Sequence, residues 1–324
     1  MGKQRLNNLS LLRVLVMLIV VWYHCLIGYT AAWHGDPYGA GIVPLWQGML
    51  PVIASFHMSV FTILSGYLYG YGRSWGGYNN VKAFVGKKSY RVLIPYLFWG
   101  VVLILIQERE VKTLLTGVSH LWYLLFIYEA YLSFRLVDHE NKLIENKGRL
   151  LVVFSTFVLL VANQVIEYIP VNILGLRQFV LYMPYYVIGV YIGYHRNIVC
   201  KNVFMTVLLV LSVIFYGLMY ATDPSHQYNL MAGLPLSVSI FLLFYRLKIS
   251  SMPAIIGSLD KCSMGIYILH HIFIQSINSN ELVHPVMESH VIIYPIALFF
   301  VVLALSWVIT HYVAQNKIGK MILG

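Results

Sequence analysis

Long apolar segments separated by short polar ones repeat along the whole chain. An α-helix rises about 1.5 Å per residue, so each apolar segment is about long enough to cross a bilayer. The pattern predicts an all-α, polytopic membrane protein with about ten transmembrane helices, and residues 1–324 as a single membrane domain with no separate soluble domain. The predicted spans are residues 9–30, 46–71, 89–107, 120–137, 149–169, 177–195, 202–220, 229–245, 254–277 and 290–313.

Composition supports this class. The 324 residues are 59% hydrophobic and 10% charged, with a mean hydropathy of +0.74. The net charge of +10 comes from basic residues scattered between apolar segments, which fits membrane topology better than nucleic-acid binding. Cys25, Cys200 and Cys262 share no metal-ligand or redox spacing, and we expect neither a disulfide framework nor a metal site.

The positions of Lys and Arg predict the orientation in the membrane. With the N-terminus in the cytoplasm, 16 of the 22 Lys and Arg residues fall in inside segments and three in outside segments. The three outside residues are Arg109, Lys112 and Arg177, while Arg13, Arg135 and Lys261 lie within spans or at their edges. Because cytoplasmic loops are enriched in Lys and Arg, both termini are predicted to be cytoplasmic.

The first predicted span carries two ionisable residues, Arg13 and His24, in the sequence SLLRVLVMLIVVWYHCLIGYT. A step of eleven residues places their side chains on nearly the same helix face, about 16 Å apart along the axis. Charged groups inside a membrane are costly and indicate a functional site. Arg13, near the cytoplasmic boundary, could hold an anionic ligand, and His24, near mid-depth, could transfer protons.

Other spans carry polar side chains at comparable depths. In the second span, His57 is predicted at the depth of His24, and Ser65 with Gly66 at the depth of Arg13, where small residues let neighbouring helices approach. Glu129 is the only carboxylate well inside a span. The ninth span carries Tyr267 and His270 beyond its inner boundary.

The inside loop before the third span, residues 82–91, is the most basic stretch of the chain. Lys87, Lys88 and Arg91 are predicted at its cytoplasmic mouth. Positive charge there suits a phosphorylated ligand or anionic lipid headgroups.

Five segments in order resemble the acyltransferase-3 family of bacterial membrane-bound O-acyltransferases. They are Arg13 and His24 with ten residues between them, FHMSVFTILSGYLYG, KKSYRVLIPY, HLWYL and SMGIYILHH, and they cover most of the chain to about residue 275. The resemblance implies transfer of an acyl group, usually acetyl, from cytoplasmic acyl-CoA to a sugar hydroxyl of a cell-surface polysaccharide or its lipid-linked precursor. It places the protein in the bacterial cytoplasmic (inner) membrane.

The resemblance also implies roles. His24 would be the base or the acyl carrier, with Arg13 holding the donor or the surroundings of His24. Lys87, Lys88 and Arg91 would bind the phosphates of acetyl-CoA or another acyl-CoA, and the candidate supporting residues are His57, Glu129, Ser65, Tyr267 and His270. Two departures stand out: LNNLSLLR has no carboxylate before Arg13, and Lys88 replaces an arginine of the basic loop.

Each of these residues also has a structural alternative. His24 could be a core histidine bonded to a backbone carbonyl, and Arg13 could extend to the inner headgroups. His57 could bond between helices, Ser65 could serve close packing, and Glu129 could pair with a cation or histidine inside the membrane. The basic loop could serve topology alone.

Two other function classes remain open at this point. One is a proton-coupled secondary transporter or flippase for a glycan or lipid precursor, with Arg13, His24 and Glu129 as its relay, although the chain has no internal repeat or paired interrupted helices. The other is a non-catalytic assembly subunit. The expected partners are acyl-CoA, the glycan acceptor and the lipid bilayer. The protein could also form a homodimer.

Overall fold

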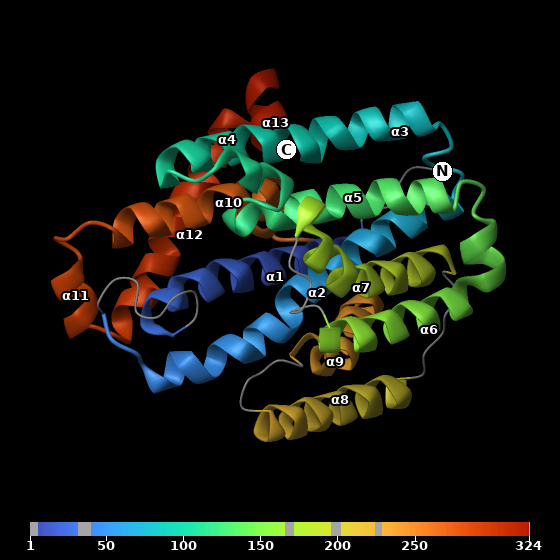
Figure 1. Cartoon of the computed structure of the whole chain (residues 1–324), viewed down its shortest axis with the longest axis horizontal. Coiled ribbons are helices and arrows are strands. Elements are labelled where there is room, and N and C mark those ends of the chain that lie inside the picture. Colours follow the sequence, from blue (N-terminus) through green and yellow to red (C-terminus); the bar gives the residue numbers. More distant parts are fainter. Residues whose placement is uncertain (1–5, 32–39, 166–171, 196–201, 224–228, 324) are drawn as a thin grey trace. The chain divides into compact units, whose positions relative to one another are not determined.

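The described part of the protein is built from α-helices. The computed structural model describes residues 6–31, 40–165, 172–195, 202–223 and 229–323, and this part contains no β-strand. The helices are α1 (Asn7–Leu26), α2 (Pro44–Ser74), α3 (Val81–Lys88), α4 (Ile94–Gln107), α5 (Trp122–Val137), α6 (Lys142–Val165), α7 (Leu176–Tyr194), α8 (Asn202–Thr222), α9 (Asn229–Arg246), α10 (Ala254–Asn278), α11 (His284–Ser289), α12 (Ile293–Val313) and α13 (Lys317–Leu323) (Figure 1).

Helix length and composition identify a multi-pass membrane protein. Among the described residues, six helical stretches are long and apolar enough to cross a bilayer. They are Asn7–Tyr29, Pro44–Ser74, Val81–Gln107, Ile173–Tyr194, Asn229–Arg246 and Ile293–Val313. Each of the ten predicted spans contains a helix, and the number of helices that cross the membrane stays a prediction. The predicted end of the fifth span and Cys200 lie outside the described residues.

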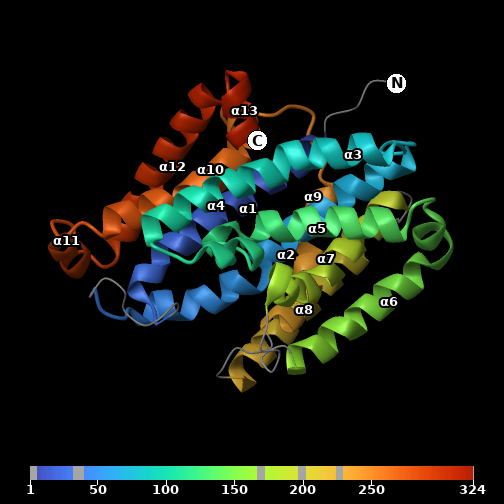
Figure 2. The same ribbon diagram turned by 45° about the horizontal axis from the view of Figure 1, so that its top comes forward.

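The basic segment before the third span is helical, and its assignment as a loop was wrong. The side chain of Asn80 accepts a hydrogen bond from Ala83 N at 3.0 Å and caps α3. A π-helical turn, Ser89–Leu93, then joins α3 to α4, so that both form one continuous ribbon (Figure 2). Pro95 has no N–H to donate to the preceding turn, and a wider turn there accommodates the missing bond.

The chain divides into two compact units. Unit 1 comprises Met1–Met58 and Leu243–Leu323, and unit 2 comprises Ser59–Leu242. In unit 1, α1, α10 and α12 pack against one another. The segment between the predicted spans 254–277 and 290–313 includes the short helix α11.

Glycines bring α2 and α7 into direct backbone contact in unit 2. Gly66 and Gly70 of α2 face Gly189 and Gly193 of α7, with four-residue spacing on both helices. A Cβ at Gly66 would overlap the carbonyl of Tyr186, and a Cβ at Gly189 would overlap the carbonyl of Ile63. Small residues at this spacing permit close helix packing in membranes. The small residues around Ser65 therefore serve packing against α7.

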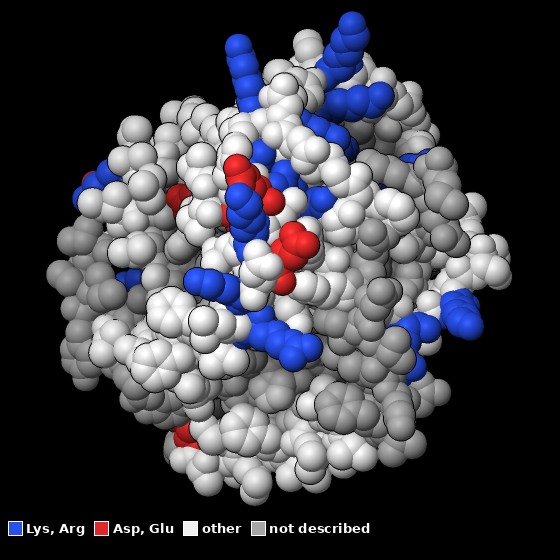
Figure 3. All heavy atoms as spheres, turned by 90° about the vertical axis from the view of Figure 1, so that its right-hand side faces the viewer, with Lys and Arg blue, Asp and Glu red and all other residues white. Residues whose placement is uncertain are grey.

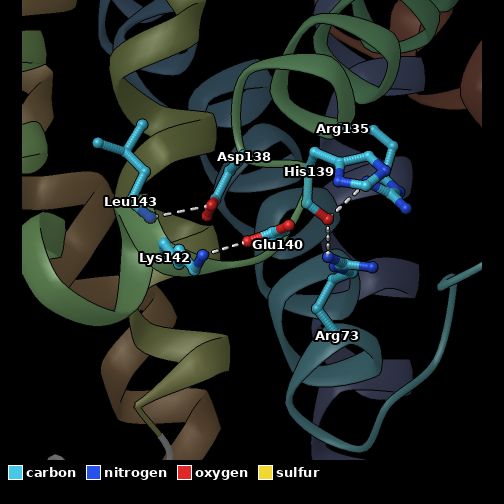
Figure 4. A network of polar contacts seen from close by, with 7 residues as sticks. All are labelled: Arg73, Arg135, Asp138, His139, Glu140, Lys142 and Leu143. Atoms are coloured by element: carbon cyan, nitrogen blue, oxygen red, sulfur yellow. Dashed lines mark hydrogen bonds and ion pairs between the residues drawn. The ribbon is translucent and has the colours of Figure 1, made fainter.

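Buried arginines hold two connections of unit 2 together. Arg73 and Arg135 are 4% and 1% exposed and both donate to the carbonyl of His139, at 2.9 Å each (Figure 4). Both also donate to the carbonyl of Tyr78, at 3.1 Å each. The connections before α3 and after α5, both predicted to be cytoplasmic, therefore lie at the same end of unit 2.

The connection between α5 and α6 carries its own polar contacts. Buried Asp138 accepts from the backbone N–H of Leu143 (Figure 4) and from that of Ile144, each at 3.0 Å, and satisfies donors at the start of α6. The exposed Lys142 ammonium hydrogen-bonds Glu140 and holds the pKa of that carboxyl below its usual range. Figure 3 faces the side on which this connection lies and shows Lys and Arg side chains together with a few carboxylates.

Candidate active site

Two polar pairs join α1 to α10 within unit 1. Toward the start of α1, Arg13 Nη1 donates to Asp260 Oδ1 at 3.1 Å. Toward its end, His24 Nδ1 and His270 Nε2 lie 3.2 Å apart. Residue numbers rise together in these pairs, so α1 and α10 run parallel. The prediction that Arg13 and His24 share one helix face is confirmed, because both contact α10.

The hydrogen bonds of His24 fix which of its nitrogens carries the proton. Nδ1 lies 2.8 Å from the carbonyl oxygen of Val20, and a carbonyl can only accept, so Nδ1 donates. A neutral imidazole has one N–H, and the lone pair therefore resides on Nε2. His24 thus has the carbonyl bond expected of a core histidine and keeps a basic nitrogen as well.

His270 has the same tautomer by the same argument. Its Nδ1 donates to the carbonyl of Ile266 at 3.1 Å, which leaves Nε2 as an acceptor. That Nε2 faces Nδ1 of His24, so the Nδ1–H of His24 is shared between Val20 and His270. His270 Nε2 is therefore placed to accept a hydrogen bond from the Nδ1–H of His24.

Further rings surround His24. The His271 ring packs edge-on against it at 5.0 Å, and the Tyr23 ring does so at 5.2 Å. Tyr23 also stacks on His57 at 4.8 Å, which brings the two histidines predicted at similar depth into one cluster. Nδ1 of His57 donates to the carbonyl of Ile53 in its own helix at 2.7 Å. This bond lies within one helix and does not link two helices.

The cluster is shielded from solvent. His24, His57 and His270 are 7%, 5% and 0% exposed. Tyr267 is buried beside them, with its ring 5.9 Å from that of His270. No three His, Cys, Asp or Glu residues of the described chain are arranged to hold a metal ion. The arrangement offers an imidazole base in a site with little water.

Asp260 is the partner that sequence reasoning missed. The chain has no carboxylate before Arg13, and α10 supplies one instead. The side chains of Asp260 and Arg13 are 9% and 29% exposed, and the Arg13 side chain makes no other hydrogen bond to the described part of the chain. The spacing between Asp260 and His270 in the sequence is nearly the same as that between Arg13 and His24. This similarity could have indicated that Asp260 pairs with Arg13 where His270 meets His24.

Two predicted supporting residues lie in unit 2, each with its own neighbours. Ser65 Oγ and the hydroxyl of Tyr123 lie within hydrogen-bond distance at 3.2 Å. Tyr123 is buried. Glu129 forms no ion pair with a described residue, and its Oε1 is buried without a hydrogen-bond partner there. The expected cation or histidine partner of Glu129 is absent from the described chain.

The three predicted phosphate-binding residues do not share one environment. Lys88 Nζ lies 3.4 Å above the ring of Tyr131 and 5.7–5.8 Å from the rings of Phe84 and Tyr78. This aromatic cage holds the ammonium through cation–π attraction. Lys87 and Arg91 are exposed. Lys88 therefore stabilises the helical segment, and its ammonium does not share the exposed surroundings of Lys87 and Arg91.

Comparison with protein families decides between the function classes. A family model described as an acyltransferase domain matches residues 6–311. The chain belongs to the acyltransferase-3 family. Comparison with curated proteins and with solved structures finds no significant match.

Membership in the acyltransferase-3 family makes the protein an acyltransferase, in agreement with the resemblance of its five segments. An acyltransferase in a bilayer needs an acyl donor and an acceptor. The transporter and assembly-subunit alternatives lose their basis, because the match covers nearly the whole described chain.

Proposed function

We propose that this acyltransferase is an O-acetyltransferase of the bacterial cytoplasmic membrane. It moves an acetyl group from cytoplasmic acetyl-CoA to a hydroxyl of a cell-surface polysaccharide or its lipid-linked precursor. The observation that supports this most directly is the Nδ1–H bond of His24 to Val20, which leaves the Nε2 lone pair as a base.

The chemistry follows from that atom. Nε2 of His24 takes the proton of the acceptor hydroxyl while the hydroxyl oxygen attacks the thioester carbonyl. The carbon–sulfur bond then breaks, and the CoA thiolate leaves and takes the proton back from His24. If His24 carries the acetyl group instead, the same lone pair attacks the thioester first. Both routes need the same tautomer.

Positive charge serves the donor in this proposal. Arg13 donates one N–H to Asp260, and its other guanidinium N–H groups can donate to an anionic group. Lys87 and Arg91 are exposed and suit phosphates, and Arg91 has the planar fork that binds them through two hydrogen bonds. Lys88 acts by fixing the helical segment that presents them.

The test is acylation of the cell surface in a strain that depends on this protein. The substitution His24→Ala removes the base, and surface acylation is expected to disappear while the protein level in the membrane stays that of the wild type. The control is His311→Ala, in an exposed histidine of α12, which should acylate normally. Full acylation by a well-expressed His24→Ala protein would overturn the catalytic assignment.

A further inference from the structure

A second histidine completes the site around His24. The Nδ1–H of His24 has two acceptors that differ in kind. The carbonyl of Val20, at 2.8 Å, belongs to the helix that carries His24, whereas His270 Nε2, at 3.2 Å, comes from α10. The carbonyl sets the tautomer of His24. A bond from a second helix also limits how the ring can turn about its own side-chain torsions.

We propose that His270 is a positioning residue for His24: its Nε2 accepts the Nδ1–H of His24, orients the ring and stabilises the imidazolium that forms when His24 Nε2 takes a proton. This role rests on the proposed function.

The geometry supports a one-way donation. His270 cannot be a donor toward His24 through Nε2 while neutral, because its single N–H is directed at Ile266 from Nδ1. The acceptor is therefore a neutral imidazole, where many enzymes place a carboxylate behind a catalytic histidine. An uncharged acceptor suits a buried membrane site, since a second isolated charge there would be costly to desolvate.

Burial and an ion pair between α1 and α10 hold His270 in place. It is fully buried, and α10 is held beside α1 at its other end by the Arg13–Asp260 ion pair. The reaction itself balances without His270 changing its bonds. The proton from the acceptor hydroxyl goes to His24 Nε2 and then to the CoA thiolate, and His24 Nδ1–H stays hydrogen-bonded to His270 throughout.

Two amide substitutions separate positioning from packing. In His270→Gln the side-chain carbonyl can reach the place of Nε2, whereas in His270→Asn it reaches only the place of Nδ1. Both are polar and smaller than histidine, so their burial costs are similar. The wild type and His311→Gln, which changes an exposed histidine of the same unit, serve as references.

Acetyl transfer is measured on purified full-length protein in nanodiscs, with radiolabelled acetyl-CoA and purified glycan acceptor, and folding is checked by size-exclusion chromatography. His270→Asn should lower kcat by about tenfold or more with the KM for acetyl-CoA within about twofold, as for groups that orient a reactive histidine. His270→Gln should recover most of that loss.

The outcomes separate the two claims. If the wild type shows transfer that depends on His24 but His270→Asn matches it, or if both amides lose activity equally while folded, His270 is not a positioning residue. If both variants raise KM and leave kcat unchanged, His270 contacts substrate instead, and the proposal is again wrong. Failure of the proposed function would appear differently, as transfer by the wild type that does not depend on His24.

Discussion

Arg13 and Asp260 form an ion pair of unequal members. The carboxylate is nearly buried and the guanidinium is about a third exposed. Removing one partner of such a pair leaves the other charge without compensation. In the proposed function, however, the guanidinium has a second task, because its remaining donors are directed to the acyl donor.

This asymmetry yields a prediction for the two single substitutions. Arg13→Gln should reduce acetyl transfer by about tenfold or more, since a charge-assisted hydrogen bond contributes roughly 1.5–3 kcal/mol. Asp260→Asn keeps the cation and should cost less. Initial rates in membranes, normalised to the amount of folded protein, measure both. Equal losses that the charge-swapped pair Arg13→Asp with Asp260→Arg restores would show that the pair serves only to hold α1 and α10 together.

At the scale of helices, the interface of α2 and α7 depends on four glycines. A side chain at Gly189 would force the carbonyl of Ile63 and the backbone of Tyr67 away from α7. The buried tyrosines of unit 2, including Tyr185 and Tyr186, pack around this contact and follow any shift of α7.

Gly189→Leu is therefore expected to destabilise the protein. Overpacking of this kind costs about 1–3 kcal/mol, which lowers the midpoint of thermal unfolding in detergent by roughly 2–4 °C. The matched control is Gly217→Leu in α8, where a Cβ meets nothing within 4 Å and the residue is exposed. Equal midpoints for the two variants would mean that α2 and α7 do not depend on this packing.

The sequence was sufficient for much of the architecture at this scale. Hydropathy located a helix in each predicted span, and the boundaries of α10 and α12 agree within a few residues. The segment from Lys82 to Arg91 was misassigned because its many polar residues resemble a loop, whereas capping by Asn80 and packing against α5 make it helical. Local composition does not report such tertiary contacts.

The candidate site was only partly predictable for the same reason. The eleven-residue step from Arg13 to His24 is a property of one helix, and its consequence was confirmed. Which helix faces that stripe depends on packing between residues about 250 positions apart, so Asp260 was missed as a partner. Lys88 was expected to face an anion, but nearby rings offer its ammonium a cage that the sequence does not reveal.

At the scale of the whole molecule, contacts within each unit agree with the predicted sidedness. In unit 1, Asn7 donates to a carbonyl just after α9, and Asn8 donates to carbonyls in the last turn of α9. The start of α1 and the end of α9 are both predicted to be cytoplasmic. Tyr29 and Trp46 donate to carbonyls near α11, on the predicted outside. In unit 2, the arginine contacts join two predicted cytoplasmic connections.

Cysteine labelling in intact cells tests this orientation. Leu282, in the connection before α11, is 83% exposed, and Leu282→Cys should react with a membrane-impermeant maleimide. Glu140→Cys, between α5 and α6, should react only after the membrane is permeabilised. Cys25 and Cys262 are buried, and the parent protein measures any background from Cys200. The reverse pattern would place the termini outside.

The dependence of acetyl transfer on His24 is measured with purified protein in nanodiscs and radiolabelled acetyl-CoA, comparing the wild type with His24→Gln. We predict that the wild type cleaves the thioester and passes the label to the glycan acceptor, and that His24→Gln, although folded, does neither. Label retained on the wild-type protein before acceptor is added would identify His24 as an acyl carrier rather than a base. Equal thioester cleavage by both proteins would show that His24 is neither the base nor the acyl carrier.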